Sequence, residues 1–203
     1  MFTGIVTHKA PVTSAEISEG ILRLRLSTAD GFTDRLTTGA SISVNGVCLT
    51  VVAFGANTVA FDVIDESLRL TNLAELKSTH LVNLERAASF GDEIGGHLLS
   101  GHIQTQATLA ERHETDSNVE MVLAFDPKWQ KYVIAKGYIA VNGCSLTIGR
   151  VEEGSFSLHL IPETLRLTNL EDAAPGAKFN IEFDHQTMTI VETVERVMAA
   201  IPP

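Results

Sequence analysis

One phrase occurs twice in this chain, and the repetition restricts the fold more than any other feature of the sequence. Val44–Val51 reads V-N-G-V-C-L-T-V, and Val141–Ile148, which begins 97 positions later, reads V-N-G-C-S-L-T-I, identical at five of eight positions. The same offset aligns Glu66–Leu73 with Glu163–Leu170 at seven of eight positions. Unrelated segments agree at roughly one position in fifteen. The chain is therefore interpreted as a tandem duplication.

The length of the period indicates two small domains. Solenoid and propeller repeats run to ~20–50 residues, whereas a period of 97 residues is the size of a compact domain. We expect homologous domains at residues 1–97 and 98–186 and a tail at residues 187–203. Of the 203 residues, 44% are hydrophobic and 20% are charged, as in an ordinary soluble globular protein.

Charge and cysteine content argue against several classes of protein. The net charge is −10 and no basic patch is evident, so a nucleic acid partner is not expected. No basic region precedes an apolar run at the start of the chain, and no stretch reaches the ~18 apolar residues of a membrane span. Cys48 and Cys144 form no C-x-x-C and lie at different positions of the repeat, which favours free thiols in a reducing cytoplasm.

Strand patterns dominate both repeats. Ile21–Leu26 alternates leucine with arginine, as a half-buried antiparallel strand does. Asn45-Gly46 and Asn142-Gly143 are hairpin dipeptides between apolar runs. Thr58–Ile64 and Ser155–Ile161 are further predicted strands. Six or so short strands in each repeat indicate an all-β fold made of two small antiparallel barrels.

Helical patterns are limited to one short segment in each repeat and to the tail. The short helices are expected to start near Ser67 and Thr164, whose hydroxyls could cap the first amides. From Gln186 onward the apolar residues form one helical stripe, namely Ile190, Val191, Val194, Val197 and Met198. The helix could pack on its own barrel or join chains together. The second alternative is favoured because two closed barrels leave it little other core to join.

The common nucleotide, zinc and hydrolase signatures are absent from the sequence. Gly91–His97 reads G-D-E-I-G-G-H, which is not the dinucleotide-binding G-x-G-x-x-G, and no G-x-x-x-x-G-K-[ST] or G-x-S-x-G occurs. His97 and His102 are five positions apart, which is not the spacing of a helical zinc-ligand pair.

Polar residues that occur in only one repeat are the candidates for chemistry, because residues needed by the fold tend to occur in both. His102 aligns with Ile5, and Lys136 aligns with Gly39. A lysine and a titratable histidine beside a ligand can stabilise negative charge and move protons. Sequence drift is the alternative explanation for each such position, since most exposed polar residues are simply solvated. The same asymmetry marks Ser41 against Tyr138 and Asp184 against Ala87.

Six motifs together resemble the riboflavin synthase family over essentially the whole chain. They are M-F-T-G-I-V, N-G-V-C-L-T-V, D-E-I-G-G-H-L-L-S-G-H, N-G-C-S-L-T-I, L-I-P-E-T-L and T-V-E-R-V, in the family's order and spacing. The loop Leu76–Asn83 departs from the pattern, because L-K-S-T-H-L-V-N stands where a Gly-Asp turn is expected.

The resemblance implies a fold, an assembly and a reaction. Each half would be a six-stranded Greek-key barrel that binds one 6,7-dimethyl-8-ribityllumazine, and the C-terminal helix would assemble a homotrimer. The active site would form where the first barrel of one chain faces the second barrel of a neighbour. Two lumazines would dismutate by transfer of a four-carbon unit, giving riboflavin and 5-amino-6-(D-ribitylamino)uracil, the last step of riboflavin biosynthesis. Neither a metal nor an organic cofactor would take part.

The resemblance also implies site residues, carried over position by position. Those implied in turnover are Phe2, Ser41, Cys48, His102, Lys136, Ser145, Thr147 and Asp184. The implied first pocket comprises Gly4, Ile5, Val6, Cys48, Leu49, Thr50, Asp62, Val63, Ile64, Asp65, Glu66 and Ser67. The implied second pocket comprises Gly101, His102, Ile103, Lys136, Ser145, Leu146, Thr147, Leu160, Ile161, Pro162, Glu163, Thr164 and Leu165.

The family's chemistry suggests roles for some of these residues. His102 could remove a proton from the acidic 7-methyl group of one lumazine, with Ser145 and Thr147 as hydroxyl donors. Cys48 or Ser41 could assist nucleophilic attack at C7 of the other. Holding two rings together can itself lower a barrier by ~7–11 kcal/mol, so single side chains could contribute modestly.

Structural roles and other functions remain open at this stage. Cys48 could be a core thiol, Phe2 a plug for the barrel end, and Thr50 and Thr147 partners for backbone groups. Non-catalytic antenna proteins that bind lumazine share the duplicated fold that the resemblance implies. Both sets of motifs are intact here, which favours the enzyme. A flavin-reductase-type barrel would need an attached nicotinamide-binding domain, for which this chain has no room.

Overall fold

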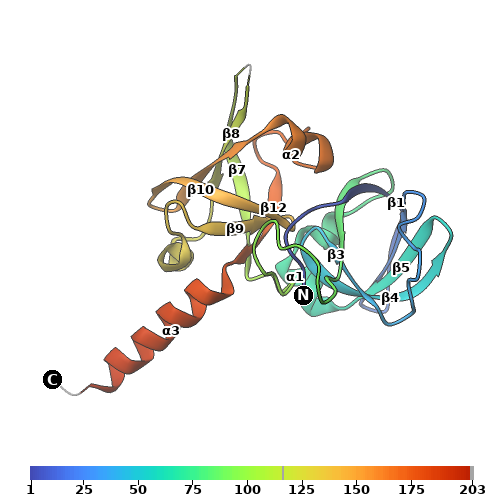
Figure 1. Ribbon diagram of the computed structural model, residues 1–203, viewed down its shortest axis with the longest axis horizontal. Coiled ribbons are helices and arrows are strands. Elements are labelled where there is room, and N and C mark those ends of the chain that lie inside the picture. Colours follow the sequence, from blue (N-terminus) through green and yellow to red (C-terminus); the bar gives the residue numbers. More distant parts are fainter. Residues whose placement is uncertain (116, 202–203) are drawn as a thin grey trace.

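Two closed barrels and a long C-terminal helix make up the protein, in a computed structural model that describes residues 1–115 and 117–201 (Figure 1). The first barrel consists of β1 (His8–Ser18), β2 (Ile21–Ser27), β3 (Ser41–Val44), β4 (Val47–Gly55), β5 (Thr58–Val63) and β6 (Leu81–Arg86). The second consists of β7 (Thr105–Glu114), β8 (Val119–Ala124), β9 (Tyr138–Val141), β10 (Cys144–Glu152), β11 (Ser155–Leu160) and β12 (Lys178–Phe183).

Both barrels have the same strand order, which confirms the predicted fold class. Around the first barrel the strands run β1-β2-β5-β4-β3-β6, and the second repeats that order with β7 to β12. All neighbouring strands are antiparallel. Their order departs from the order along the chain, because β2 pairs with β5 and β1 pairs with β6, as in a Greek key. The exact domain boundaries at residues 97 and 186 remain predictions.

The local patterns form the structures that their chemistry predicts. In β2, Leu22, Leu24 and Leu26 are buried while the arginines between them are exposed. The hairpin dipeptides adopt positive φ at both residues, 47° and 82° at Asn45-Gly46 and 45° and 79° at Asn142-Gly143. Such turns match the twist of the strands that they join.

The predicted starts of the short helices are wrong. α1 (Asp65–Leu70) and α2 (Pro162–Leu167) begin two residues before Ser67 and Thr164, and neither has a side-chain cap. Acidic residues in the first turn of each helix, and proline at the start of α2, favour these positions instead. The preceding strands accordingly end at Val63 and Leu160, one residue earlier than expected.

Two short 3₁₀ helices complete the fold of the barrels. η1 (Asn72–Glu75) follows α1 and is capped by Thr71, whose hydroxyl accepts from the Leu73 amide at 3.3 Å. η2 (Pro127–Tyr132) connects β8 to β9 and is capped by Asp126.

Six asparagines join the two barrels, three from each repeat at equivalent positions: Asn45, Asn72, Asn83, Asn142, Asn169 and Asn180. The Asn83 amide donates to the Asn142 carbonyl at 2.9 Å, and the Asn180 amide donates to the Asn45 carbonyl at the same distance. The side-chain oxygens of Asn180 and Asn83 accept from the backbone amides of Asn72 and Asn169, each at 2.7 Å. Buried amides that satisfy one another in this way fix a unique arrangement of the barrels, because any other would leave them unpaired.

The tail forms α3 (His185–Ala200), which confirms the predicted helix and extends away from the second barrel (Figure 1). Met188 and Val191 pack against that barrel, and Lys131 of η2 holds Glu195 at 2.5 Å. The rest of the predicted stripe is uncovered within the chain, since Ile190 is 64% and Val194 54% exposed.

Candidate functional site

The segments that open the two repeats are exchanged between the barrels. Phe2 and Leu99 pair with each other through two backbone hydrogen bonds of 2.9 Å. Beyond this pair, Val6 packs in the core of the second barrel, whereas Ile103 packs against the core of the first. Each barrel is thus completed by residues from the opposite repeat.

This exchange corrects the predicted grouping of the two pockets. The Ser145 amide donates to the Gly4 carbonyl at 2.8 Å, and the Cys48 amide donates to the Gly101 carbonyl at 2.8 Å. Gly4 to Val6 therefore belong with Ser145 on the second barrel, and Gly101 to Ile103 belong with Cys48 on the first. The sequence aligned the opening segments with their own repeats, because it contains no sign of which barrel they would join.

Glycine is required at both contacts. Gly4 has φ of +76° and Gly101 of +80°, in the left-handed region that glycine tolerates. A Cβ on Gly4 would lie 2.5 Å from the Ser145 Cβ, and one on Gly101 would lie 2.5 Å from the Cys48 Cβ. The backbone of each opening segment can approach its partner strand only because these side chains are absent.

A buried glutamate holds each opening segment in place. Glu85 accepts from the Thr3 amide at 2.6 Å and the Gly4 amide at 3.0 Å, and Glu182 accepts in the same way from Ser100 and Gly101. Burial raises the pKa of both carboxyls, while these hydrogen bonds lower it. Glu85 and Glu182 make equivalent hydrogen bonds in the two repeats. They position both parts of the site and do not account for the difference between them.

The surface around the contact of Gly4 with Ser145 is the second-barrel corner, and the surface around the contact of Gly101 with Cys48 is the first-barrel corner. The second-barrel corner contains a histidine that was not among the predicted site residues. His97 Nδ1 lies 2.7 Å from Ser145 Oγ, and its ring stacks on Tyr138 with centroids 5.1 Å apart. The side chain is 7% exposed, and its Nε2 has no hydrogen-bond partner among the described residues. Burial lowers the pKa of His97, and the negative charge of Asp184 opposes that shift. His97 therefore positions Ser145, and its burial disfavours the charged imidazolium.

No comparison between repeats could have found His97. It lies immediately before the second repeat, and the offset of 97 leads to no residue of the first. The available sign was its place in G-G-H, because Gly96 must pass close to Ser145: a Cβ there would lie 2.7 Å from the Ser145 Cβ.

The first-barrel corner is more open and has different chemistry. Cys48 is partly buried and packs against Phe2, Leu99 and Ala140. His102 follows Gly101, the backbone partner of Cys48, and is exposed. The structure thus brings Cys48 and His102 to one corner through the backbone contact between Cys48 and Gly101.

Flanking strands bring two more of the predicted residues to the first corner. Ser41 on β3 lies directly opposite Thr50 on β4, and the exposed Thr50 follows Cys48 on the same strand by two positions. Residues two apart on a strand share a face, so Cys48 and Thr50 point to the same side. In the second corner Thr147 is placed equivalently, opposite Tyr138.

Lys136 and Asp184 lie near the second corner, and each also has a place in the local structure, Lys136 in a turn and Asp184 at the start of α3. Lys136 is exposed, has φ of +67°, and donates its amide to the Ile148 carbonyl at 2.9 Å. Its counterpart Gly39 also has positive φ, 90°, so the turn requires this conformation in both repeats. Asp184 is the N-cap of α3, accepting from the Thr187 amide at 2.9 Å and hydroxyl at 2.7 Å.

The remaining predicted binding residues form the outer parts of both corners. Val63 and Leu160 are buried, whereas the isoleucines that follow them are uncovered, Ile64 at 61% and Ile161 at 60% exposed. Exposed in the same segments are Asp62, Asp65, Glu66, Pro162 and Glu163, while Ser67, Thr164 and Leu165 are partly buried. On the central strands Leu49 is buried and Leu146 partly buried. Phe2 is fully buried, so it supports the corner from behind.

The cavities of the described chain overlap little with these corners. Ile5 lines one of about 600 Å³ beside Thr3 and Glu85, and Asp184 lines one of about 400 Å³ with His97 and Tyr138. A third, of about 740 Å³, lies between the barrels and is lined by no predicted site residue. The predicted residues thus lie largely on open surface at the two corners.

Two further classes of site are absent from residues 1–115 and 117–201. No cluster of three or more histidine, cysteine, aspartate or glutamate side chains there could hold a metal ion. None of the helices in that part of the chain has the length and apolar character needed to cross a membrane.

Comparison with known proteins gives consistent matches along the chain. The lumazine binding domain matches twice, at residues 3–87 and 100–184. Riboflavin synthase of Escherichia coli K12 is 46% identical over 201 residues, which is 98% of this chain and 94% of that protein. Riboflavin synthase of Chlamydia pneumoniae is 38% identical, covering 98% of each. The solved structure of LumP complexed with riboflavin superimposes with a TM-score of 0.84 at 26% identity, covering 91% of this chain and all of LumP.

Proposed function

Because this chain belongs to the riboflavin synthase family and carries its lumazine binding domain twice, we propose that it is an enzyme of that activity. It converts two molecules of 6,7-dimethyl-8-ribityllumazine into riboflavin and 5-amino-6-(D-ribitylamino)uracil. The observation that carries the assignment is the match to curated riboflavin synthases over the full length, at 46% identity for the protein of Escherichia coli.

The reaction fits a chain with two similar but unequal corners. One lumazine gives up a four-carbon unit and the other accepts it, so the two products together contain every atom of the two substrates. No external oxidant or reductant is needed. Two equivalent binding corners place two copies of one substrate, and their different side chains, Ser145 with His97 against Cys48 with His102, allow donor and acceptor roles.

The residues of each corner have separate tasks in this proposal. His102, which is exposed and titratable, removes a proton from the 7-methyl group of one lumazine. Cys48 assists nucleophilic attack at C7 of the other, with Ser41 beside it. Ser145, held by His97, and Thr147 donate hydrogen bonds to the charge that develops on the ring. The Lys136 ammonium stabilises the same negative charge.

The complete site requires a second copy of the chain. Ile64 and Ile161 leave apolar surface uncovered at both corners, and α3 presents an uncovered apolar stripe. A homotrimer held through α3 places the first barrel of one chain against the second barrel of the next and stacks the two lumazines between them. Holding the rings in contact can lower the barrier by ~7–11 kcal/mol. The reaction takes place in the cytoplasm, where both free thiols remain reduced.

The test is to mix the pure protein with 6,7-dimethyl-8-ribityllumazine alone. Riboflavin should appear with its characteristic fluorescence, one molecule for every two lumazines consumed, and its rate should survive exhaustive chelation and dialysis. Tight binding of lumazine with no conversion would identify a non-catalytic lumazine-binding protein instead. A requirement for an added metal or redox cofactor would contradict the proposal.

A further inference from the structure

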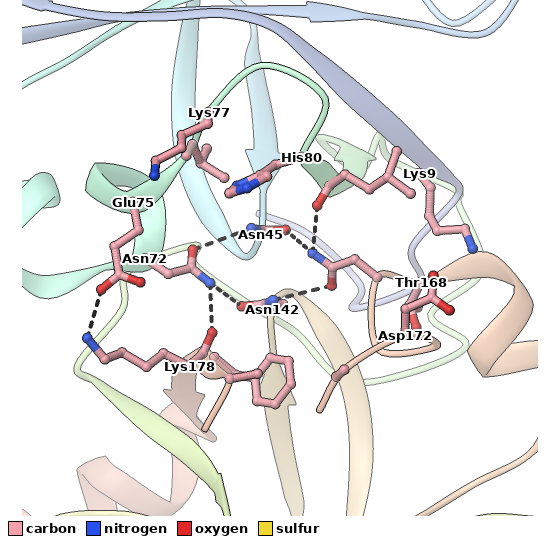
Figure 2. A pocket seen from close by; sticks show the side chains of 16 residues that line it. Lys9, Asn45, Asn72, Glu75, Lys77, His80, Asn142, Thr168, Asp172 and Lys178 are labelled. Atoms are coloured by element: carbon pink, nitrogen blue, oxygen red, sulfur yellow. Dashed lines mark hydrogen bonds and ion pairs between the residues drawn. The ribbon is translucent and has the colours of Figure 1, made fainter. Parts of the chain in front are cut away.

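A cavity lies between the barrels, lined by none of the residues that form the two corners of the proposed active site. It measures about 740 Å³, within the range of small-molecule sites. Figure 2 shows that Asn45, Asn72 and Asn142, three of the asparagines joining the barrels, lie at its centre, surrounded by charged side chains from both repeats. None of its lining residues belongs to the predicted lumazine site.

Two buried asparagines in this cavity have donors to spare. Asn45 and Asn142 are each 2% exposed, and an amide nitrogen carries two N–H donors. Among the described residues, Asn45 Nδ2 makes a single hydrogen bond, to Asn72 at 3.4 Å, and Asn142 Nδ2 makes one to Asn169 at 3.3 Å. By contrast, Asn72 and Asn169 each use both donors. The cavity therefore offers two buried donors to a ligand that carries acceptor oxygens.

Each cationic side chain around the cavity occurs in only one of the two repeats. Lys9, Lys77, His80 and Lys178 align with Gln106, Ala174, Ala177 and Leu81 of the other repeat. The acidic lining residue Glu75, in contrast, has an acidic counterpart in Asp172. The groove is therefore symmetric in its asparagines and acids and asymmetric in its positive charge.

Ion pairing leaves one end of the cavity positive. Lys9 lies 2.6 Å from Glu171 and Lys178 lies 2.7 Å from Glu75, so both are neutralised. Lys77 forms no salt bridge within the described residues and shares a short loop with His80. That loop, Leu76–Asn83, is where the sequence departs from the family pattern. Asp172, from the second repeat, lines the cavity wall and forms no salt bridge among residues 1–115 and 117–201.

From these contacts we propose that the groove between the barrels binds a small phosphate monoester that also carries hydroxyl groups, such as a sugar phosphate. Lys77 and His80 hold the phosphate, the free N–H groups of Asn45 and Asn142 donate to its oxygens, and Asp172 accepts hydrogen bonds from the hydroxyls. Ammonium and amide donors to a phosphate form charge-assisted hydrogen bonds, which are among the strongest in proteins.

The probe is D-ribose 5-phosphate, titrated calorimetrically into the full-length protein at low salt, with D-ribose as the comparison. One molecule should bind per chain, and ribose should bind at least ~10-fold more weakly, because it lacks the charge that Lys77 recognises. Lys77→Met should weaken the phosphate ester ~10-fold or more. Lys128→Met, an exposed lysine on the second barrel outside the cavity, should change its affinity by less than ~2-fold.

Two further measurements place the binding. The side-chain amide signals of Asn45 and Asn142 in the ¹⁵N spectrum should shift on addition of the sugar phosphate, and saturating riboflavin should leave its affinity unchanged. Absence of saturable binding, equal binding by Lys77→Met, or competition with riboflavin would each overturn the proposal. None of these results alters the test of riboflavin formation, which uses the lumazine corners.

Discussion

The two corners of the molecule share one backbone and differ in their side chains. In each, a glycine carbonyl from the exchanged opening segment accepts from a strand residue at 2.8 Å, and a buried glutamate clamps that segment. On the second barrel the strand residue is Ser145, held by a buried histidine. On the first it is Cys48, next to the exposed His102. Duplication thus supplied two geometrically equal positions, and substitution at a few of them allowed two roles.

The largest expected effect comes from preventing the first-barrel corner of one chain from meeting the second-barrel corner of another. Deleting residues 186–203 should give folded monomers that still bind lumazine but form riboflavin at least ~100-fold more slowly, because the two rings no longer meet. Light scattering and turnover should be measured together. Val194→Asp, on the uncovered stripe of α3, should act in the same direction, whereas Arg196→Ala on the other face should not. A trimer that persists after the deletion would refute this role of the helix.

His102 should distinguish the corners next most strongly. His102→Ala should slow the chemical step by ~100-fold or more, the usual contribution of a general base. The equivalent change in the first repeat, Ile5→Ala, should affect binding and leave the chemical step nearly unchanged. Single-turnover kinetics, with lumazine affinity measured separately, tests the pair. Similar rates for both variants would remove the proposed base.

The two cysteines should behave differently. Cys48→Ser should slow turnover at least ~10-fold, about 1.4 kcal/mol of barrier, if the thiol assists attack, because a hydroxyl ionises far less readily. Cys144→Ser should leave the rate unchanged, since burial raises the pKa of that thiol to about 12 and keeps it neutral. Cys144→Ser should instead lower the free energy of unfolding, measured in urea, by ~1–3 kcal/mol.

Wild-type rates in both His102→Ala and Cys48→Ser would indicate that proximity alone drives the reaction. The corners would then differ by drift and not by function.

Lys136 tests whether backbone strain is retained for activity. Its φ of +67° suits glycine, which the first repeat has at Gly39. Lys136→Gly should therefore raise stability by ~0.5–1 kcal/mol and Tm by a few degrees while slowing turnover. Gly39→Lys should lower stability and bring no gain in rate. An unchanged rate in Lys136→Gly would show that the lysine is only solvated.

The smallest expected effect is the contribution of His97, in the second corner, to the pH dependence of stability. Burial lowers the pKa of His97 below the 6.5 of an unfolded histidine, so below that pH the unfolded state binds more protons and folding weakens. The loss begins as the pH falls through about 6.5 and is complete below the folded pKa. His97→Asn should flatten this part of the curve. Equal slopes in the wild-type protein and the variant would place His97 in solvent.

Much of the fold follows from local chemistry that the sequence displays directly. The alternation of Ile21–Leu26, the Asn-Gly turns and the offset of 97 residues predict two equal antiparallel barrels, since side-chain period and turn dihedrals are local properties. The apolar stripe likewise predicted α3. Helix starts were less accurate, because Asp65 and Pro162 favour an earlier first turn than the hydroxyls of Ser67 and Thr164 would set.

By itself the sequence determined that the chain is duplicated, that each copy forms a barrel, and which positions break the symmetry. Only the tertiary structure decided that the opening segments cross, joining Gly4 to Ser145 and Gly101 to Cys48, and that His97 completes the second corner. The physical reason is that these contacts join residues far apart in the chain, and alignment within a repeat cannot distinguish a segment that packs on its own barrel from one that packs on its neighbour. The asparagines that join the barrels favour this arrangement, since the side-chain amides of Asn83 and Asn180 donate to backbone carbonyls of the opposite repeat.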